Sequence, residues 1–331
     1  MIKMAAFSCR PDELGFFRQF GKAYGVETVT TERPPELGNA GLAEGCEAVC
    51  VLTTPVGREL IDRWHEMGVG LISTRTVGFE HIDCRYAASL GIRVTNAAYT
   101  PYTVAEYTVM AMLMALRRMK AILNRYLGQD FSLDGIRGRQ LRGMTVGVVG
   151  TGRIGERVIE MLGGFGCRIL AYDLQEKESI RGKAVYAGLE DIWRECDLIT
   201  FHTPATSKTF HMVNRETIDR MKKGVVLVNM ARGSLIDTQA LIEGLETGKI
   251  GAAALDVVEN EGGIYYKDFK YQPLKNRDMA VLGAMPNVLM TPHTAFFTDE
   301  AVSDMVECSM MSCVRFIGGE ADPLWVNGQG A

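Results

Sequence analysis

Short apolar runs alternate with amphipathic segments through residues 1–100. Runs of strand length occur at 2–7, 48–52, 69–72 and 93–95. Between them, segments such as 12–24 and 57–67 place apolar residues at helical spacing. Strands that alternate with helices favour a parallel sheet, so this region is predicted to form a small flavodoxin-like α/β domain.

A second series of apolar runs begins near residue 145. Its predicted strands are 145–149, 168–172, 184–186, 198–201, 225–229, 252–255 and 288–290. Helical patterns lie between them, notably at 154–165 and 238–247. Strands without polar alternation are buried on both faces, which predicts a doubly wound parallel sheet of the Rossmann type.

A long apolar segment at 104–127 connects the two series. Thr103 and Glu106 have the spacing of a capping box, which predicts Thr103 as the N-cap of a helix. We therefore predict one long helix that carries the chain into the second domain. The segment carries charges and falls short of the roughly 20 apolar residues that span a bilayer, so no membrane-spanning helix is predicted.

A further helical pattern at 299–317 follows the second series and is predicted to pack back on the first domain. The substrate (catalytic) domain would then comprise 1–100 plus 297–331, with the nucleotide-binding domain 101–296 inserted in it. The substrate is expected in the cleft between domains, where such sites usually lie. The glycine-rich tail, 318–331, is predicted to be loose.

A glycine-rich turn follows the strand at 145–149. Its glycines are Gly150, Gly152 and Gly155, and Asp173 ends the next predicted strand. In a dinucleotide site these glycines allow a tight turn, close approach of the pyrophosphate and close helix–strand packing. The helix N-terminus offers N–H groups to the phosphates, and Asp173 would accept hydrogen bonds from the adenosine ribose. The pattern predicts a dinucleotide-binding site rather than an ordinary strand–turn–helix unit.

Composition narrows the functional classes. The 331 residues are 47% hydrophobic and 23% charged, with a net charge of −4 and no long basic run, which argues against nucleic acid as the main partner. The eight cysteines form no C-x-x-C pair and mostly lie in apolar runs. Reduced thiols in the cytoplasm are therefore favoured over disulfides or a metal site.

Three polar residues follow strands of the second series. Histidine is the commonest proton donor near neutral pH, and His293 comes directly after the strand 288–290. Arg232 follows 225–229, where it could grip a carboxylate, and Glu261 lies in an acidic segment after 252–255. Taken singly, each has an alternative interpretation: a structural histidine, a surface ion pair and a solvated acidic loop.

Together, Arg232, Glu261 and His293 resemble the catalytic trio of the D-isomer specific 2-hydroxyacid dehydrogenases. The glycine turn with Asp173 is similar to that family's cofactor fingerprint. Segments 77–78 and 99–101 are similar to its substrate-binding loops. The likeness covers nearly the whole chain and is greatest to the D-lactate dehydrogenase branch, including the enzymes of vancomycin resistance, and to clostridial 2-hydroxyisocaproate and phenyllactate dehydrogenases.

The resemblance implies a role for each residue. His293 would protonate the carbonyl oxygen, Glu261 would favour the protonated form of His293, and Arg232 would bind the substrate carboxylate. Residues that would contact the substrate are Val77, Gly78, Tyr99 and Phe296, the last as a candidate pocket residue. Residues that would contact the cofactor are Gly150, Gly152, Arg153, Ile154, Gly155, Asp173, Thr203, Pro204, Thr209, Met230, Ala231 and Asp256.

The predicted function is NAD-dependent, reversible reduction of a 2-oxo acid to the (R)-2-hydroxy acid. Pyruvate and larger substrates such as phenylpyruvate both remain open, because one methylene changes discrimination by only about 1–3 kcal/mol. Asp173 favours NAD over NADP, since its charge would repel a 2′-phosphate. A homodimer built on the helix 104–127 is expected. The alternatives are an NAD(H)-sensing regulator of the corepressor type and an enzyme similar to phosphoglycerate dehydrogenase.

Overall fold

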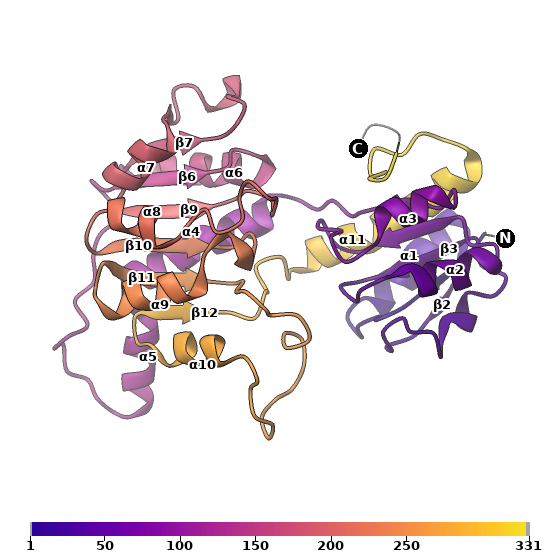
Figure 1. Cartoon of the computed structure of the whole chain (residues 1–331), viewed down its shortest axis with the longest axis horizontal. Coiled ribbons are helices and arrows are strands. Elements are labelled where there is room, and N and C mark those ends of the chain that lie inside the picture. Colours follow the sequence, from indigo (N-terminus) through magenta and orange to yellow (C-terminus); the bar gives the residue numbers. More distant parts are fainter. Residues whose placement is uncertain (1, 329–331) are drawn as a thin grey trace. The chain divides into compact units, whose positions relative to one another are not determined.

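The chain forms two compact units, each built on one parallel sheet. The computed structural model describes residues 2–328. Unit 1 comprises Met1–Thr100 with Phe297–Ala331, and unit 2 comprises Pro101–Phe296 (Figure 1). The prediction of an α/β fold with two parallel sheets is confirmed.

Unit 1 has a five-stranded sheet in the order β2-β1-β3-β4-β5, which is the flavodoxin-like order. Its strands are β1 (Ile2–Ala6), β2 (Val26–Thr30), β3 (Ala48–Val51), β4 (Leu71–Thr74) and β5 (Arg93–Thr95). Its helices are α1 (Leu14–Tyr24), α2 (Arg58–Glu66), α3 (Cys84–Ser89) and α11 (Asp299–Gly318). Two buried clusters cover the sheet: α1 and α11 pack with Met4 and Ala6, whereas Trp64 of α2 packs with Phe7 and Ile72.

The C-terminal tail of unit 1 is not loose, so that prediction is wrong for the part of the tail that is described. Trp325 forms an antiparallel bridge with Thr95, and the Val326 N–H donates to the Val94 carbonyl oxygen over 2.9 Å. Asn327 accepts from the Val94 N–H over 2.7 Å. The tail thus forms hydrogen bonds with backbone groups of the edge strand β5. The glycine-rich composition of the tail does not indicate this pairing. Residues 329–331 of the predicted tail lie outside the described residues.

Unit 2 has a seven-stranded sheet in the order β12-β11-β10-β9-β6-β7-β8, and every pair in it is parallel. Its strands are β6 (Thr145–Val149), β7 (Arg168–Tyr172), β8 (Val185–Tyr186), β9 (Leu198–Phe201), β10 (Val225–Asn229), β11 (Ile250–Leu255) and β12 (Val288–Met290). The order reverses between β6 and β9, which is where ligands bind in doubly wound sheets.

Helices cover the faces of this sheet. They are α4 (Tyr102–Leu116), α5 (Met119–Leu127), α6 (Arg153–Leu162), α7 (Leu189–Glu195), α8 (Arg215–Arg220), α9 (Thr238–Glu246) and α10 (Arg277–Ala284). Buried side chains of α7 to α10 form one cluster with β9, β10 and β11. In Figure 1, α4 lies behind the sheet, where it contacts α6, β10 and β11.

The predicted helix 104–127 is two helices, and its predicted start is wrong. Pro101 occupies the N-cap, with φ at −68°, and Thr103 lies inside α4. Proline presets a helical φ and needs no N–H partner, so the helix begins earlier than the capping box indicated. The helix then breaks at Arg118, whose φ is +54°. The Arg139 N–H donates to the Leu116 carbonyl oxygen over 2.9 Å, so a tertiary contact caps the end of α4.

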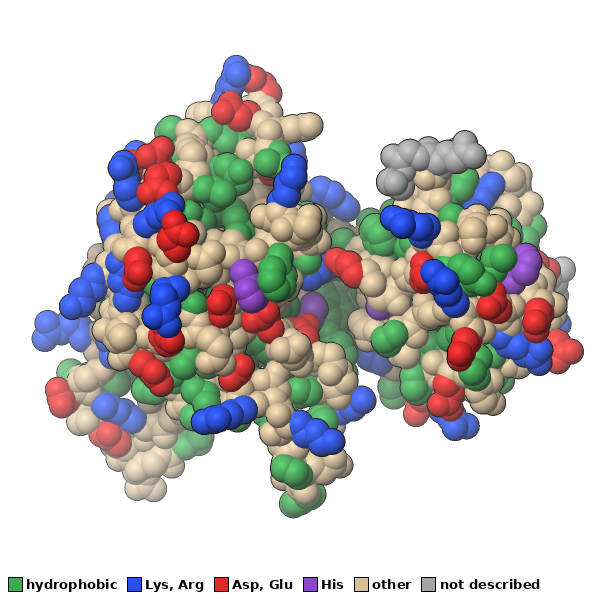
Figure 2. Space-filling view, in the orientation of Figure 1, with side chains coloured by type: hydrophobic (Ala, Val, Ile, Leu, Met, Phe, Trp, Pro, Cys, Tyr) green, Lys and Arg blue, Asp and Glu red, His purple; other side chains and the backbone are tan. Residues whose placement is uncertain are grey.

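The surface carries charges of both signs. On the face drawn in Figure 2, acidic and basic side chains are interspersed rather than gathered into separate patches. Within residues 2–328, no helix combines the length and the apolar character that a membrane crossing requires. All eight cysteines are free thiols.

Candidate active site

The glycine turn after β6 leaves no space for side chains at two of its three glycines. A Cβ at Gly150, whose φ is +97°, would lie 2.6 Å from the His202 carbonyl oxygen. A Cβ at Gly155 would lie 1.9 Å from the Gly150 carbonyl oxygen. At Gly152, by contrast, an added Cβ would meet nothing within 4 Å, so the backbone at the start of α6 stays approachable. This is the cradle that a pyrophosphate requires.

Asp173 lies beside this turn, at the end of β7. Its Oδ2 accepts from the Thr151 N–H over 2.6 Å and from the Thr151 hydroxyl over 3.1 Å. Burial by itself would raise the pKa of Asp173, but the hydrogen bonds from Thr151, Leu174 and Gln175 lower it overall. The carboxylate is therefore charged at neutral pH and lies next to the phosphate cradle. A ribose fits such a group, whereas a 2′-phosphate does not.

The remaining predicted cofactor residues lie at carboxyl ends of the same sheet. Arg153 and Ile154 begin α6, and Thr203 lies against Gly150. The hydroxyl of Thr209 donates to the Pro204 carbonyl oxygen over 2.7 Å, so this side chain shapes its own turn. Met230 and Ala231 directly follow β10, where Met230 is buried and Ala231 is half-buried, and Asp256 directly follows β11.

His293 and Glu261 are in direct contact. His293 Nδ1 lies 2.6 Å from Glu261 Oε1, and Glu261 Oε2 accepts from the Val258 N–H over 2.8 Å. The first contact directs Nδ1–H to the carboxylate, so Nε2 is the ring nitrogen that faces away from Glu261. Both side chains are about one-quarter to one-third exposed, 24% for Glu261 and 34% for His293. The pair is therefore partly accessible to a bound molecule.

The turn that carries His293 is strained and firmly held. The φ of His293 is +54°, a conformation that costs a side-chain-bearing residue of the order of 1–3 kcal/mol. The buried carboxylate of Asp256 accepts from the Thr291 hydroxyl and from the backbone N–H groups of Thr294 and Ala295, over 2.6 to 2.8 Å. The Tyr266 hydroxyl donates to the His293 carbonyl oxygen over 2.8 Å. Together these bonds fix the backbone from which the imidazole extends.

Arg232 lies in the turn after β10, next to β11 in the sheet. Asn229, which is 1% exposed, accepts from the Ala231 N–H and donates to the Arg232 carbonyl oxygen. Gly233 packs against the backbone of Val258, because a Cβ there would lie 2.2 Å from the Val258 carbonyl carbon. The Arg232 turn thus touches the segment whose N–H binds Glu261. Strand order brings all three predicted catalytic residues to one edge of the sheet.

Two other histidines near this edge differ in their chemistry. Burial lowers the pKa of His202 to about 3, so its imidazole is neutral and is no proton donor at neutral pH. His211 contacts Glu259, with 2.7 Å between Nε2 and Oε1. His211 and His293 are therefore the two histidines at this edge that are paired with a carboxylate, and His293 is the one in contact with Glu261.

An aromatic pair stands beside His293. The ring centroids of Tyr266 and Phe296 are 6.5 Å apart and the rings are perpendicular, and the centroid of Tyr266 lies 6.4 Å from that of the His293 ring.

In unit 1, the predicted substrate loop is held from both sides. The Thr76 hydroxyl donates to the Gly78 carbonyl oxygen over 2.6 Å, and Asn96 donates to that of Val77 over 2.8 Å. Tyr99 is half-buried in the same unit.

Comparison with known proteins identifies the family. Residues 109–295 match the NAD binding domain of the D-isomer specific 2-hydroxyacid dehydrogenases. The chain is 40% identical over 320 residues to an aromatic 2-oxoacid reductase of Clostridium sporogenes, covering 95% of this chain and 96% of that protein. It belongs to the D-isomer specific 2-hydroxyacid dehydrogenase family.

Other members of this dehydrogenase family match over the same length. A D-lactate dehydrogenase of Lactobacillus delbrueckii subsp. bulgaricus is 36% identical over 324 residues, 97% of each chain. A solved D-lactate dehydrogenase from Treponema pallidum superposes with a TM-score of 0.89 at 32% identity, covering 98% of this chain and 99% of that one. A solved D-2-hydroxyisocaproate dehydrogenase also reaches 0.89, at 31% identity, covering 99% and 100%.

The family assignment confirms the predicted chemistry class and cofactor. The protein is an NAD-dependent oxidoreductase that acts on a CH–OH group, and its cradle at Gly150, Gly152 and Gly155 fits that cofactor.

Two residues that support the dehydrogenase site were not predicted from the sequence. Asn229 was detectable as a polar residue that ends an apolar strand. The bond from Tyr266 to His293 gave no sequence signal, because 27 positions separate the two residues.

Proposed function

We propose that this dehydrogenase reduces 2-oxo acids to (R)-2-hydroxy acids and catalyses the reverse oxidation, with Arg232, Glu261 and His293 as its catalytic residues. The contact between His293 Nδ1 and Glu261 Oε1, 2.6 Å long and next to the Arg232 turn, carries this proposal. An acid paired with a carboxylate, together with an arginine on an adjoining turn, is a set of groups that suits carbonyl reduction.

The nicotinamide, when bound, donates or accepts the hydride. His293 donates its Nε2 proton to the carbonyl oxygen as negative charge develops there, and Glu261 balances the charge of the imidazolium. Arg232 binds the carboxylate of the substrate through two parallel hydrogen bonds, which orients the carbonyl. In the reverse direction, neutral His293 takes the hydroxyl proton.

The other site residues follow from this proposal. Val77 and Gly78 would bind the carboxylate with their backbone N–H groups, and Tyr99 would line the substrate. Thr203, Pro204, Met230 and Ala231 would flank the cofactor. Asp256 would meet the carboxamide of the nicotinamide in addition to holding the His293 turn, and Asp173 would bind the ribose.

The aromatic pair next to His293 supports an apolar substrate side chain. Tyr266 and Phe296 present ring surface beside the proton donor. We expect NADH-dependent reduction of 2-oxoisocaproate and phenylpyruvate with kcat/KM at least equal to that for pyruvate. Measuring kcat/KM for the three acids tests this order. Oxidation of NADH with none of them would contradict the proposed function and favour a regulator that only binds NAD(H).

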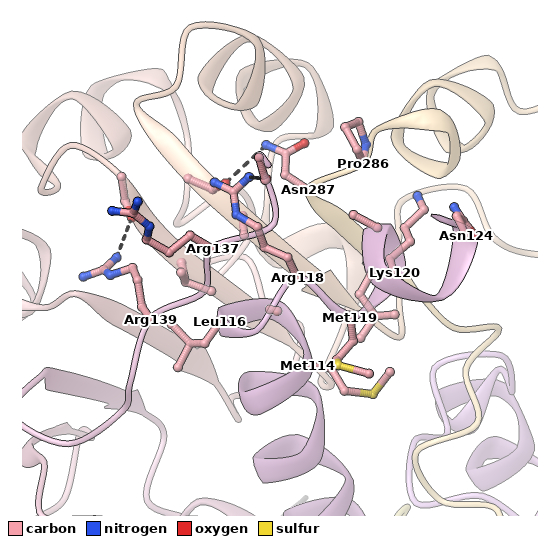
Figure 3. A pocket seen from close by; sticks show the side chains of 18 of the residues that line it. Met114, Leu116, Arg118, Met119, Lys120, Asn124, Arg137, Arg139, Pro286 and Asn287 are labelled. Atoms are coloured by element: carbon pink, nitrogen blue, oxygen red, sulfur yellow. Dashed lines mark hydrogen bonds between the residues drawn. The ribbon is translucent and has the colours of Figure 1, made fainter. Parts of the chain in front are cut away.

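A second copy of this chain is the proposed macromolecular partner. A cavity of about 580 Å³ opens where α4 meets α5, and Met114, Leu116 and Met119 line it together with Pro286 (Figure 3). The end of α5 and the residues after it, 127–133, form an arm that exposes large apolar side chains. Leu127 is 82% exposed, Phe131 72% and Leu133 84%. Basic side chains, among them Arg118, Lys120 and Arg139, also line this cavity, and its apolar part can receive the apolar arm of a second copy across a two-fold axis.

The cytoplasm is the proposed compartment of this enzyme. Its eight free thiols suit a reducing environment, in which disulfides rarely form.

A further inference from the structure

A second histidine–carboxylate pair lies close to the proposed catalytic pair. His211, in the segment after β9, places its Nε2 2.7 Å from Glu259 Oε1. Glu259 is two positions before Glu261. The two side chains are 30% and 21% exposed, respectively. The Phe210 ring stacks on the imidazole of His211, with 3.9 Å between centroids.

The second oxygen of Glu259 binds another element. Oε2 accepts from the Thr238 N–H over 3.0 Å and from the Thr238 hydroxyl over 2.7 Å, at the start of α9. The backbone carbonyl of Glu259 accepts from Asn276 over 3.0 Å. One residue thus connects the segments that follow β9, β10 and β11.

The segment containing His211 is also tied to the Arg232 turn. The His211 N–H donates to the carbonyl oxygen of Ser234 over 2.9 Å, and Ser234 is two positions after Arg232. The φ of His211 is +48°, so its backbone is held in the left-handed region. Val213 forms a parallel bridge with Ile236. His211 therefore links Glu259 to the chain that carries Arg232.

Both proposed catalytic turns meet next to Glu259. Gly233 packs on the peptide between Val258 and Glu259, where an added Cβ would lie 2.6 Å from the Glu259 nitrogen. The N–H of Val258 holds Glu261 Oε2. A shift of Glu259 would therefore move the groups that place Arg232 and Glu261.

We propose that His211 and Glu259 are positioning residues for catalysis, which fix the Arg232 turn relative to the Glu261–His293 pair. This inference rests on the proposed function, since it assumes that these three residues carry the reaction. Neither His211 nor Glu259 needs to contact the substrate. Because misplacement of a catalytic group by about 1 Å can cost about 100-fold in rate, the connection matters even at a distance.

The test compares Glu259→Ala with Asp237→Ala. Asp237 caps the same helix, accepting from Gln239 and Ala240 over 3.0 and 3.2 Å. These side-chain bonds stay at the start of α9 and do not reach the Glu261 segment. Both substitutions should lower the Tm, but only Glu259→Ala should lower kcat, by about tenfold or more. The Kd for NADH, measured by fluorescence titration, should change less than twofold in both variants.

Two conservative variants separate positioning from folding. In Glu259→Gln, the amide can still bind Thr238 and His211, so kcat should recover to within about threefold of wild type. His211→Ala leaves the bonds between Glu259 and Thr238 in place, and it should still lower kcat several-fold. This variant decides the question if Glu259→Ala does not fold.

Two results would overturn the inference. One is an equal loss of kcat in Glu259→Ala and Asp237→Ala at equal loss of Tm. The other is a kcat for His211→Ala within twofold of wild type. A wild-type enzyme without activity on any 2-oxo acid would instead overturn the proposed function, so the two failures are distinguishable.

Discussion

His293 shows how a single residue combines strain with function. A histidine at φ +54° persists only because Asp256 and Tyr266 bind the surrounding backbone. The proposed proton donor is thereby oriented before any substrate arrives, and the conformational cost is met by hydrogen bonds within the protein rather than by substrate binding.

We predict that His293→Gln lowers kcat for 2-oxo acid reduction by about 10²–10⁴-fold, because glutamine cannot donate a proton to the carbonyl oxygen. The Kd for NADH should stay within twofold of wild type. Steady-state kinetics and fluorescence titration measure both. The control is His65→Gln, an exposed histidine of α2, which should behave as wild type. Wild-type turnover in His293→Gln would exclude the acid role.

We propose that Asp173 favours NAD over NADP through its charge. We predict that Asp173→Ala reduces the preference for NADH over NADPH, in kcat/KM, by about tenfold or more, because it removes both a ribose acceptor and a repulsion. Tyr186→Phe is the matched control, since it removes the contact to the Thr151 hydroxyl without changing charge. An unchanged preference in Asp173→Ala would argue that other groups select the cofactor.

At the scale of elements, the strands of the larger sheet are the most predictable part. Strands β6, β7, β9, β10 and β12 have the predicted bounds, because strands buried on both faces form unbroken apolar runs. Strand β2 was missed, since its sequence V-E-T-V-T mixes polar with apolar residues at a sheet edge. The break between α4 and α5 was also missed, because a distant N–H from Arg139 caps α4.

An ion pair fixes the amino ends of β6 and β9. Asp197 accepts from the Thr145 N–H over 2.9 Å and from Lys222 over 3.0 Å. Burial by itself would raise the pKa of Asp197, but these donors lower it overall. Stabilisation of this kind is fully present above the unfolded-state value of about 3.9 and is lost as pH falls through the lower folded-state pKa.

We therefore predict that acid destabilises wild type more steeply than Asp197→Asn. Denaturant titrations between pH 6 and the acid end of the folded range should give the free energy of unfolding for each protein. Asp197→Asn should be less stable than wild type at pH 6, and the difference should narrow on acidification. A constant difference at every pH would show that the charge of Asp197 does not contribute.

At the scale of the whole molecule, we propose that self-association covers the apolar side chains exposed at the end of α5 and in the residues that follow it. None of the residues of α5 is buried within the chain, although Leu123 and Leu127 are large and apolar. Exposed apolar clusters of this kind mark interaction sites more often than bare surface. A face of the monomer that is incomplete by itself is best completed by an identical copy.

We predict a mass near twice 36.5 kDa by light scattering. Leu133→Asp combined with Phe131→Asp should shift the protein to the monomer, because charges in an apolar contact are costly to bury. Leu174→Asp is the control, because Leu174 is equally exposed, at 81%, but lies after β7. A wild-type monomer, or a double variant that remains dimeric, would refute the arm as the interface.

Sequence by itself determined the two parallel sheets and the cofactor turn, and it selected Arg232, Glu261 and His293 as the proposed catalytic residues. Those features are written in local patterns: apolar runs, glycine spacing and polar residues at strand ends. Only the tertiary structure decided how the proposed catalytic turns are held. The bonds from Asp256, Tyr266 and Glu259 join positions far apart along the chain. Such contacts depend on which strands become neighbours, and a local pattern does not encode this.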